Sequence, residues 1–127
     1  MSLKKELWSG EKREKLLKCA EGGTPCYAYD IEQVRQNEQE LKKKLSPTIN
    51  RFFFAVKANP HESIIRTAFE CGYGLECVSA DEVEHVMKCI PGIDPTKILF
   101  TPNFAPRSEY HKVFSIGNSS SSSPSSS

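Results

Sequence analysis

The chain has 127 residues, in which 17 Lys and Arg face 16 Asp and Glu, for a formal net charge of +1. Hydrophobic residues make up 38% and charged residues 26%, which is the balance of a globular protein of at most one domain. A nearly neutral chain lacks the basic excess of nucleic-acid-binding domains. Its longest apolar run, Phe52–Val56, is too short to span a membrane. We therefore expect neither nucleic acid nor membrane as a partner.

The N-terminal residues mix basic side chains with glutamates and contain no apolar stretch, so we expect no signal or transit peptide. None of the five cysteines belongs to a C-x-x-C pair, and the histidines have no ligand partners at metal-binding spacing. We predict no metal site, solvated or structural histidines, and reduced thiols in a cytoplasmic protein. The residues concerned are Cys19, Cys26, Cys71, Cys77, Cys89, His61, His85 and His111.

The predicted elements begin with an N-terminal helix and strand segment, residues 1–30. Helix formers predict a helix over Glu11–Ala20, and a short β-prone run follows at Cys26–Tyr29. Apolar residues at helical spacing predict a second helix that begins at the capping residue Asp30 and ends at Ser46-Pro47.

Residues 31–117 continue with three strand–helix units. The strands are expected to begin about 23 residues apart, and this regular alternation with short loops predicts an α/β fold with a parallel sheet. Such spacing fits a barrel and a doubly wound sheet equally well. The strands are predicted over Arg51–Val56, Leu75–Val78 and Lys97–Thr101, and the helices over Glu62–Cys71, from the Ser79/Glu82 capping box to Ile90, and after Pro106.

The C-terminal tail differs in composition from the rest of the chain. Its last nine residues are eight serines and Pro124. Such a segment buries too little apolar surface to offset its ordering entropy, so residues 118–127 are predicted to be disordered.

Lys57 is the position most suggestive of chemistry. It ends an apolar strand, and ligand sites of α/β folds lie at the carboxyl ends of strands. By alternation it shares a face with Phe53 and Ala55, where partial desolvation favours a nucleophilic amine for Schiff-base chemistry. The alternative is a lysine that leaves the strand into solvent.

Three motifs resemble one known family. Phe54-Ala55-Val56-Lys57-Ala58-Asn59-Pro60 is similar to the strand and lysine of the alanine-racemase-like barrel decarboxylases, which use pyridoxal phosphate. Gly72–Val83 resembles their second strand and following helix, and Thr24–Asp30 their entry segment. The resemblance is greatest to diaminopimelate decarboxylases, and Ile98–Arg107 is similar to a subgroup of them.

The resemblance implies a partial (β/α)8 TIM barrel and a role for three residues. Lys57 would form the Schiff base with pyridoxal 5'-phosphate, Ala55 would pack beside the cofactor ring, and Glu76 would lie near the cofactor and steady the lysine ammonium. Ordinary core packing for Ala55 and a non-catalytic rim carboxylate for Glu76 remain open. Ser79 is expected to be a helix cap, and Asn103 and Arg107 to lie at the active-site end of the third strand.

The implied activity is decarboxylation of an amino acid, foremost of meso-diaminopimelate to L-lysine in lysine biosynthesis, by an enzyme that is a homodimer at full length. The chain holds three of eight barrel strands and none of the family's later elements, including its C-terminal β domain. We therefore expect this N-terminal part alone to be inactive. Alternatives are a non-catalytic binding or regulatory barrel fragment, or a decarboxylase or racemase for another amino acid such as ornithine or arginine.

Overall fold

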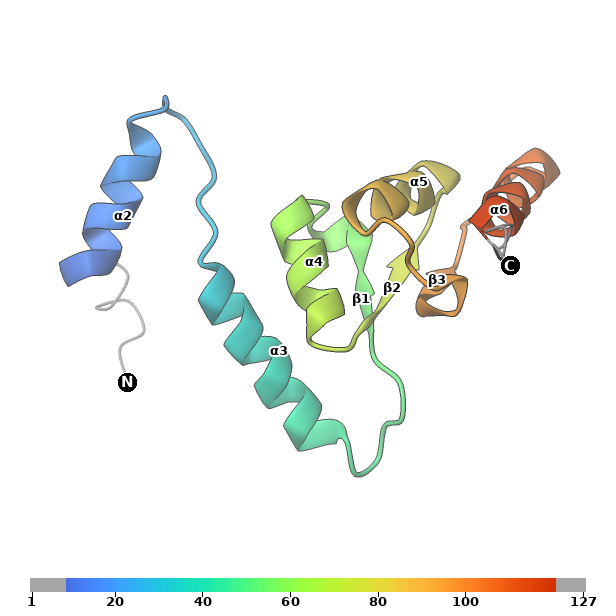
Figure 1. Ribbon diagram of the computed structural model, residues 1–127, viewed down its shortest axis with the longest axis horizontal. Coiled ribbons are helices and arrows are strands. Elements are labelled where there is room, and N and C mark those ends of the chain that lie inside the picture. The colour runs from blue at the N-terminus through green and yellow to red at the C-terminus, as the bar shows by residue number, and fades with distance from the viewer. Residues whose placement is uncertain (1–8, 121–127) are drawn as a thin grey trace, which may run out of the picture. The chain divides into compact units, whose positions relative to one another are not determined.

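The computed structural model describes residues 9–120, and they divide into two compact units at Asp30/Ile31 (Figure 1). In the first unit, helix α2 (Gly10–Ala20) has no buried residue. The predicted strand at Cys26–Tyr29 is wrong, because these residues have no regular secondary structure. Tyr27 is 92% exposed, so β-prone residues here lack a partner strand and an apolar surface to pack on.

The second unit contains the three strand–helix units. Helix α3 (Ile31–Leu45) leads into them, and it packs against α4. The remaining elements, in chain order, are β1 (Phe53–Ala55), the 3-10 turn η1 (Val56–Ala58), α4 (Glu62–Glu70), β2 (Gly74–Cys77), α5 (Ala80–Cys89), the 3-10 turn η2 (Pro95–Lys97), β3 (Ile98–Phe100) and α6 (Arg107–Ser120).

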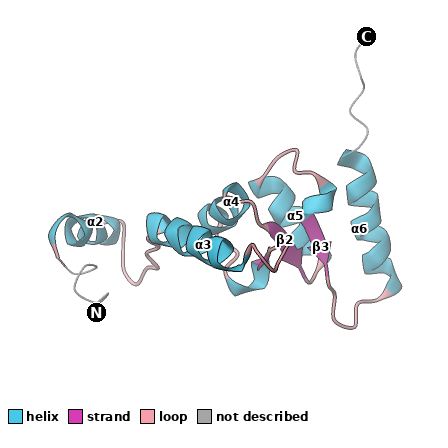
Figure 2. Ribbon diagram, turned by 90° about the horizontal axis from the view of Figure 1, so that it is seen from below, coloured by secondary structure: helices cyan, strands magenta, loops and turns pink. Residues whose placement is uncertain are grey.

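The sheet has three parallel strands in the order β1-β2-β3 (Figure 1), and Figure 2 shows β2 and β3 side by side. The pairs Phe53↔Gly74 and Ala55↔Glu76 join β1 to β2, and Cys77↔Phe100 joins β2 to β3. The first and third strands are shorter than predicted, whereas β2 has the predicted length and begins one residue earlier. The first ends at Ala55 because the chain turns into η1, which places Val56 in the core and interrupts the alternation.

The two faces of the sheet have different surroundings. The face that the helices cover, here called the covered face, carries Phe54, Leu75, Cys77, Ile98 and Phe100, all of which belong to or pack against the hydrophobic core. Because paired residues of parallel strands point to the same side, the intervening residues form the other face. This open face consists of Phe53, Ala55, Gly74, Glu76 and Leu99, and the core cluster includes none of them.

The winding of the chain separates a barrel from a doubly wound sheet. Ile65 of α4, Val83 and Val86 of α5, and Val113 of α6 all pack on the covered face. Sequential parallel strands whose following helices lie on one side are the winding of a (β/α)8 barrel, whereas a doubly wound sheet has helices on both sides. The second unit is thus three successive units of a barrel wall.

The helix caps agree with the sequence pattern at α5. The backbone N–H of Glu82 donates to Ser79 Oγ at 3.2 Å, and Glu82 Oε2 accepts from the N–H of Val78 at 2.8 Å. The carboxylate therefore reaches one residue further back than in a standard capping box. A second carboxylate, that of Glu109 on α6, accepts from the N–H of Ala80 at 2.9 Å and links α6 to the start of α5.

The structure also corrects the predicted start of the disordered C-terminal tail at residue 118. Helix α6 continues through Ser120, so residues 118–120 are helical rather than disordered. Hydroxyls that bond back one turn accompany this extension, since Ser115 Oγ donates to His111 O at 2.8 Å and Ser119 Oγ to Ser115 O at 2.7 Å. The rest of the predicted tail, residues 121–127, lies outside the described residues.

Candidate active-site face

Lys57 lies directly beyond the carboxyl end of β1, in the turn η1. Val56 beside it is fully buried and anchors the turn, and the N–H of Asn59 donates to Val56 O at 3.1 Å. This arrangement leaves the Lys57 side chain exposed. The partial burial expected from strand alternation is absent, because the chain leaves the strand conformation at Val56. Among the described residues, its ammonium has no ion-pair or hydrogen-bond partner.

Ala55 and Glu76 are direct neighbours across the β1–β2 ladder, on the open face. Both are half-buried. The hydroxyl of Thr101, one residue beyond β3, donates to Glu76 Oε1 in a short hydrogen bond. This bond continues the ladder, in which the N–H of Thr101 donates to Cys77 O at 2.9 Å. The carboxylate is thus held near the carboxyl ends of the strands, the end where Lys57 follows β1.

The amino-terminal part of the open face is filled by an aromatic ring. A Cβ at Gly74 would lie 2.4 Å from Cε1 of Phe53, so only glycine allows the ring to lie across β2. Leu99 on β3 is 41% exposed. Apolar surface thus adjoins the carboxylate, and this combination suits a flat, partly polar ligand on the face.

The other residues considered from the sequence have structural or exposed positions. Ser79 caps α5 as predicted. Nδ1 of His61 caps α4 by accepting from the N–H of Ser63 at 3.3 Å, and Nε2 of His85 lies 2.7 Å from Pro60 O. Asn103 and Arg107 follow β3 and are exposed.

The covered face carries one titratable group with a strongly shifted pKa, the thiol of Cys77. Burial raises the pKa of the Cys77 thiol on β2 to about 12, with smaller contributions from the Glu82 and Glu76 carboxylates. It is therefore a neutral thiol in the core and not a nucleophile. Within the described residues, no group of three His, Cys, Asp or Glu could hold a metal ion, and no helix is long and apolar enough to cross a membrane.

Thr101 is the site residue that the sequence did not single out. It ended the predicted third strand, two positions after Leu99, so alternation alone would have placed it on the same face as Leu99. Its partnership with Glu76 depends on the pairing register between β2 and β3, which the spacing of the strands does not specify.

Comparison with known protein families identifies the family of this chain. The sequence profile of the pyridoxal-dependent decarboxylases, for their pyridoxal-binding domain, matches residues 31–119. The chain belongs to this family. The match begins where the second structural unit begins and covers all three strands. The family cofactor is pyridoxal phosphate, as the motif around Lys57 implied.

The similar relatives include several diaminopimelate decarboxylases. That of Methanothermobacter thermautotrophicus is 36% identical over 85 residues, which are 65% of this chain and 19% of the relative. That of Helicobacter pylori is 33% identical over 78 residues, which are 61% of this chain and 19% of the relative. The chain thus spans about a fifth of the length of the curated relatives it matches.

Solved structures show the same fold. The ornithine decarboxylase of Entamoeba histolytica matches 83% of this chain and 33% of its own, with a TM-score of 0.61 and 23% identity. The arginine decarboxylase of Paramecium bursaria Chlorella virus matches 67% of this chain and 22% of its own, with a TM-score of 0.57 and 20% identity. At these identities the likeness concerns the fold alone.

The residues present fit one part of a pyridoxal phosphate site. Lys57 offers an exposed primary amine that has no partner among the described residues, which an aldehyde-bearing ring requires. Ala55 adds a small side chain and Glu76 an oriented carboxylate. The open face is accessible to such a ring, because the core cluster lies on the other side of the sheet.

Proposed function

We propose that this chain supplies the lysine-bearing part of the active site of a pyridoxal-phosphate-dependent amino-acid decarboxylase. Its substrate is meso-diaminopimelate and its product L-lysine, within lysine biosynthesis. The single observation that carries the proposal is the exposed amine of Lys57 at the carboxyl end of β1, within the segment that matches the pyridoxal-binding domain. The diaminopimelate decarboxylases among the relatives support the choice of substrate.

Each residue has a defined part in this proposal. Bound pyridoxal phosphate supplies an electron sink for the carbanion left when carbon dioxide departs. Lys57 provides the amine that binds the cofactor covalently. Ala55 leaves space beside it, since a larger side chain would project from the open face toward the ring. Glu76, held by Thr101, provides a negative charge that stabilises the lysine ammonium once the amine is free.

We also propose that this chain is inactive by itself. Both outer strands, β1 and β3, have unpaired edges among the described residues, and the chain spans about a fifth of its relatives. We therefore expect no decarboxylation by the isolated chain and activity only in a full-length homodimer. A cytoplasmic location is part of the proposal, supported by five cysteines that are all free thiols.

Reductive trapping tests the role of Lys57. The chain is incubated with one equivalent of pyridoxal phosphate, reduced with borohydride, digested and mapped by mass spectrometry. We expect most of the label on Lys57, and a loss of most of it in Lys57→Ala, while Lys88→Ala, an exposed lysine of α5, leaves it unchanged. Label spread evenly over the exposed lysines would contradict the assignment.

The substrate is tested in a chimera. Residues 31–119 replace the matching segment of the Methanothermobacter thermautotrophicus diaminopimelate decarboxylase. We expect the chimera to release carbon dioxide from diaminopimelate and to lose this activity with Lys57→Ala. Activity on ornithine or arginine in place of diaminopimelate would overturn the choice of substrate, and a chimera that folds and binds cofactor without turnover would favour a non-catalytic role.

A further inference from the structure

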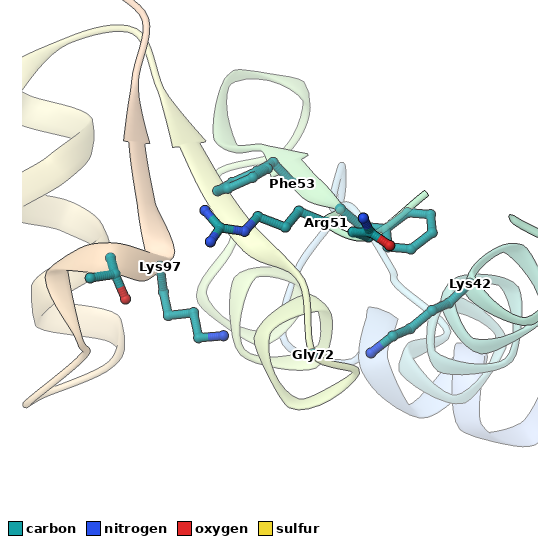
Figure 3. A pocket seen from close by; sticks show the side chains of 8 residues that line it. Lys42, Arg51, Phe53, Gly72 and Lys97 are labelled. Carbon is teal, nitrogen blue, oxygen red and sulfur yellow. The ribbon is translucent and has the colours of Figure 1, made fainter. Parts of the chain in front are cut away.

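A hollow lies at the end of the sheet opposite to the one that Lys57 follows (Figure 3). Its volume is about 180 Å³. Arg51 precedes β1, Gly72 precedes β2, and Thr96 and Lys97 precede β3, so the amino ends of all three strands contribute to it. Lys42 of α3 completes the lining on the side of the helices.

The charged residues that line this hollow are all cations. Among residues 9–120, Lys42, Arg51 and Lys97 line it, and no carboxylate does. Within the part of the chain that the structure describes, none of these three cations has an ion-pair partner, although eight pairs form elsewhere. Three like charges around one hollow repel one another and attract a counter-ion of more than one negative charge.

The neighbouring carboxylates have other partners. Asp94 is the nearest to Lys97 in sequence, and its Oδ1 accepts from the N–H of Thr96 at 2.9 Å, which caps η2. That bond lowers the pKa of Asp94 more than the charge of Lys97 does. Glu70, at the end of α4, pairs with Arg35 at 2.8 Å. Neither carboxylate lines the hollow.

One of the three cations is held in place by the backbone. Nζ of Lys42 donates to Cys71 O at 3.0 Å, at the C-terminal end of α4. Gly72 has a φ of +86°, and a Cβ there would lie 2.4 Å from Nζ, so glycine keeps the path of the ammonium open. Figure 3 shows Lys42 and Lys97 extending toward Gly72 from opposite sides, while Arg51 extends beside Phe53.

We propose that this hollow binds a small phosphate-type oxyanion, either free or carried by a small molecule. A doubly charged tetrahedral anion suits a hollow lined by three cations, because its oxygens accept hydrogen bonds from guanidinium and ammonium groups. The site is distinct from the Lys57 end, because Arg51 and Lys57 flank opposite ends of β1, a strand of about 10 Å. One small anion cannot contact both.

The test is an NMR titration of the 127-residue chain with inorganic phosphate, with sodium chloride adjusted to keep the ionic strength constant. We expect saturable shifts of the amides of Gly72 and Lys97, which line the hollow. Arg51→Gln and Lys97→Gln should each raise the Kd at least fivefold, and their spectra show whether each variant is folded. The two variants are independent, so either one suffices for the comparison.

Two matched controls decide the location. Lys43→Gln removes an exposed charge next to Lys42 but outside the hollow, and it should leave the Kd unchanged. Lys57→Ala should also leave it unchanged. Shifts that do not saturate, an equal effect of Lys43→Gln, or loss of binding in Lys57→Ala would each overturn the proposal. A parallel titration with glycerol phosphate distinguishes the two sources of the anion. A site for the free anion should bind inorganic phosphate and glycerol phosphate equally well, whereas a site for a phosphate monoester should bind glycerol phosphate more tightly.

Discussion

The covered and open faces of one small sheet differ in what they contribute to the protein. Leu75 and Cys77 on the covered face are fully buried, while Leu99 on the open face is 41% exposed. Adjacent residues of the same strand therefore serve different purposes, since Glu76 lies between Leu75 and Cys77 and points to the other side. Within the strands, the two-residue period therefore separates the side chains of the core from those of the candidate site.

The largest effect that this division predicts is on stability. Leu75→Ala should lower the free energy of unfolding by about 2–5 kcal/mol, because it leaves a cavity where the core cluster surrounds a fully buried side chain. Leu99→Ala, the same change on the open face, should cost less than about 1 kcal/mol. Urea unfolding measures the free energy of unfolding of both variants. Equal losses in Leu75→Ala and Leu99→Ala would contradict the distinction between the two faces.

Alkaline pH should act on the covered face through Cys77. Its pKa is about 12 in the folded chain against an ordinary value of 9.0, so the unfolded chain loses the thiol proton first. The stability that this thiol contributes is complete below about pH 9 and is lost as the pH rises toward 12.

Cys77→Ala should reduce this alkaline loss by roughly 2 kcal/mol near pH 11. Cys26→Ala, at an exposed thiol, is the control and should not change the pH dependence. Urea unfolding between pH 8 and pH 11 compares the slopes, so that any loss of packing common to all pH values cancels. Parallel curves for wild type and Cys77→Ala would contradict the pKa shift. Burial also raises the pKa of Tyr73 to about 12, so the unfolding free energy of both wild type and Cys77→Ala should still fall with rising pH.

The cap of α5 provides a smaller effect. Ser79→Ala should cost about 1 kcal/mol, because the N–H of Glu82 loses its acceptor at the start of a helix that packs on the covered face. Ser115→Ala on α6 removes an exposed hydroxyl in mid-helix and should be nearly neutral. Urea unfolding distinguishes them, and a neutral Ser79→Ala would mean that the carboxylate of Glu82 alone secures this helix start.

The smallest effect on stability should come from the open face itself. Glu76→Gln keeps an acceptor for Thr101 and should change the free energy of unfolding by less than about 0.5 kcal/mol. It should nevertheless reduce the share of borohydride-trapped cofactor on Lys57 severalfold, because the negative charge is gone. Glu40→Gln on α3 is the control. An unchanged share of label would assign Glu76 to the rim and remove it from the site.

The local sequence was sufficient for the element order of residues 31–117 and for the placement of Lys57 at a strand end. Apolar runs, helical spacing and the Ser79 cap are short-range signals, and the structure confirms each of them. The strand expected at Cys26–Tyr29 shows the limit of such signals, because a β-prone run becomes a strand only beside a partner.

Tertiary structure decided the features that depend on pairing and packing. The choice of a barrel wall over a doubly wound sheet follows from helices packed on one face, and the bond between Thr101 and Glu76 follows from the register of β2 and β3. The exposure of Lys57 follows from burial of Val56, which turns the chain out of the strand. The cluster of Lys42, Arg51 and Lys97 brings together residues 55 positions apart in sequence, which only folding makes neighbours.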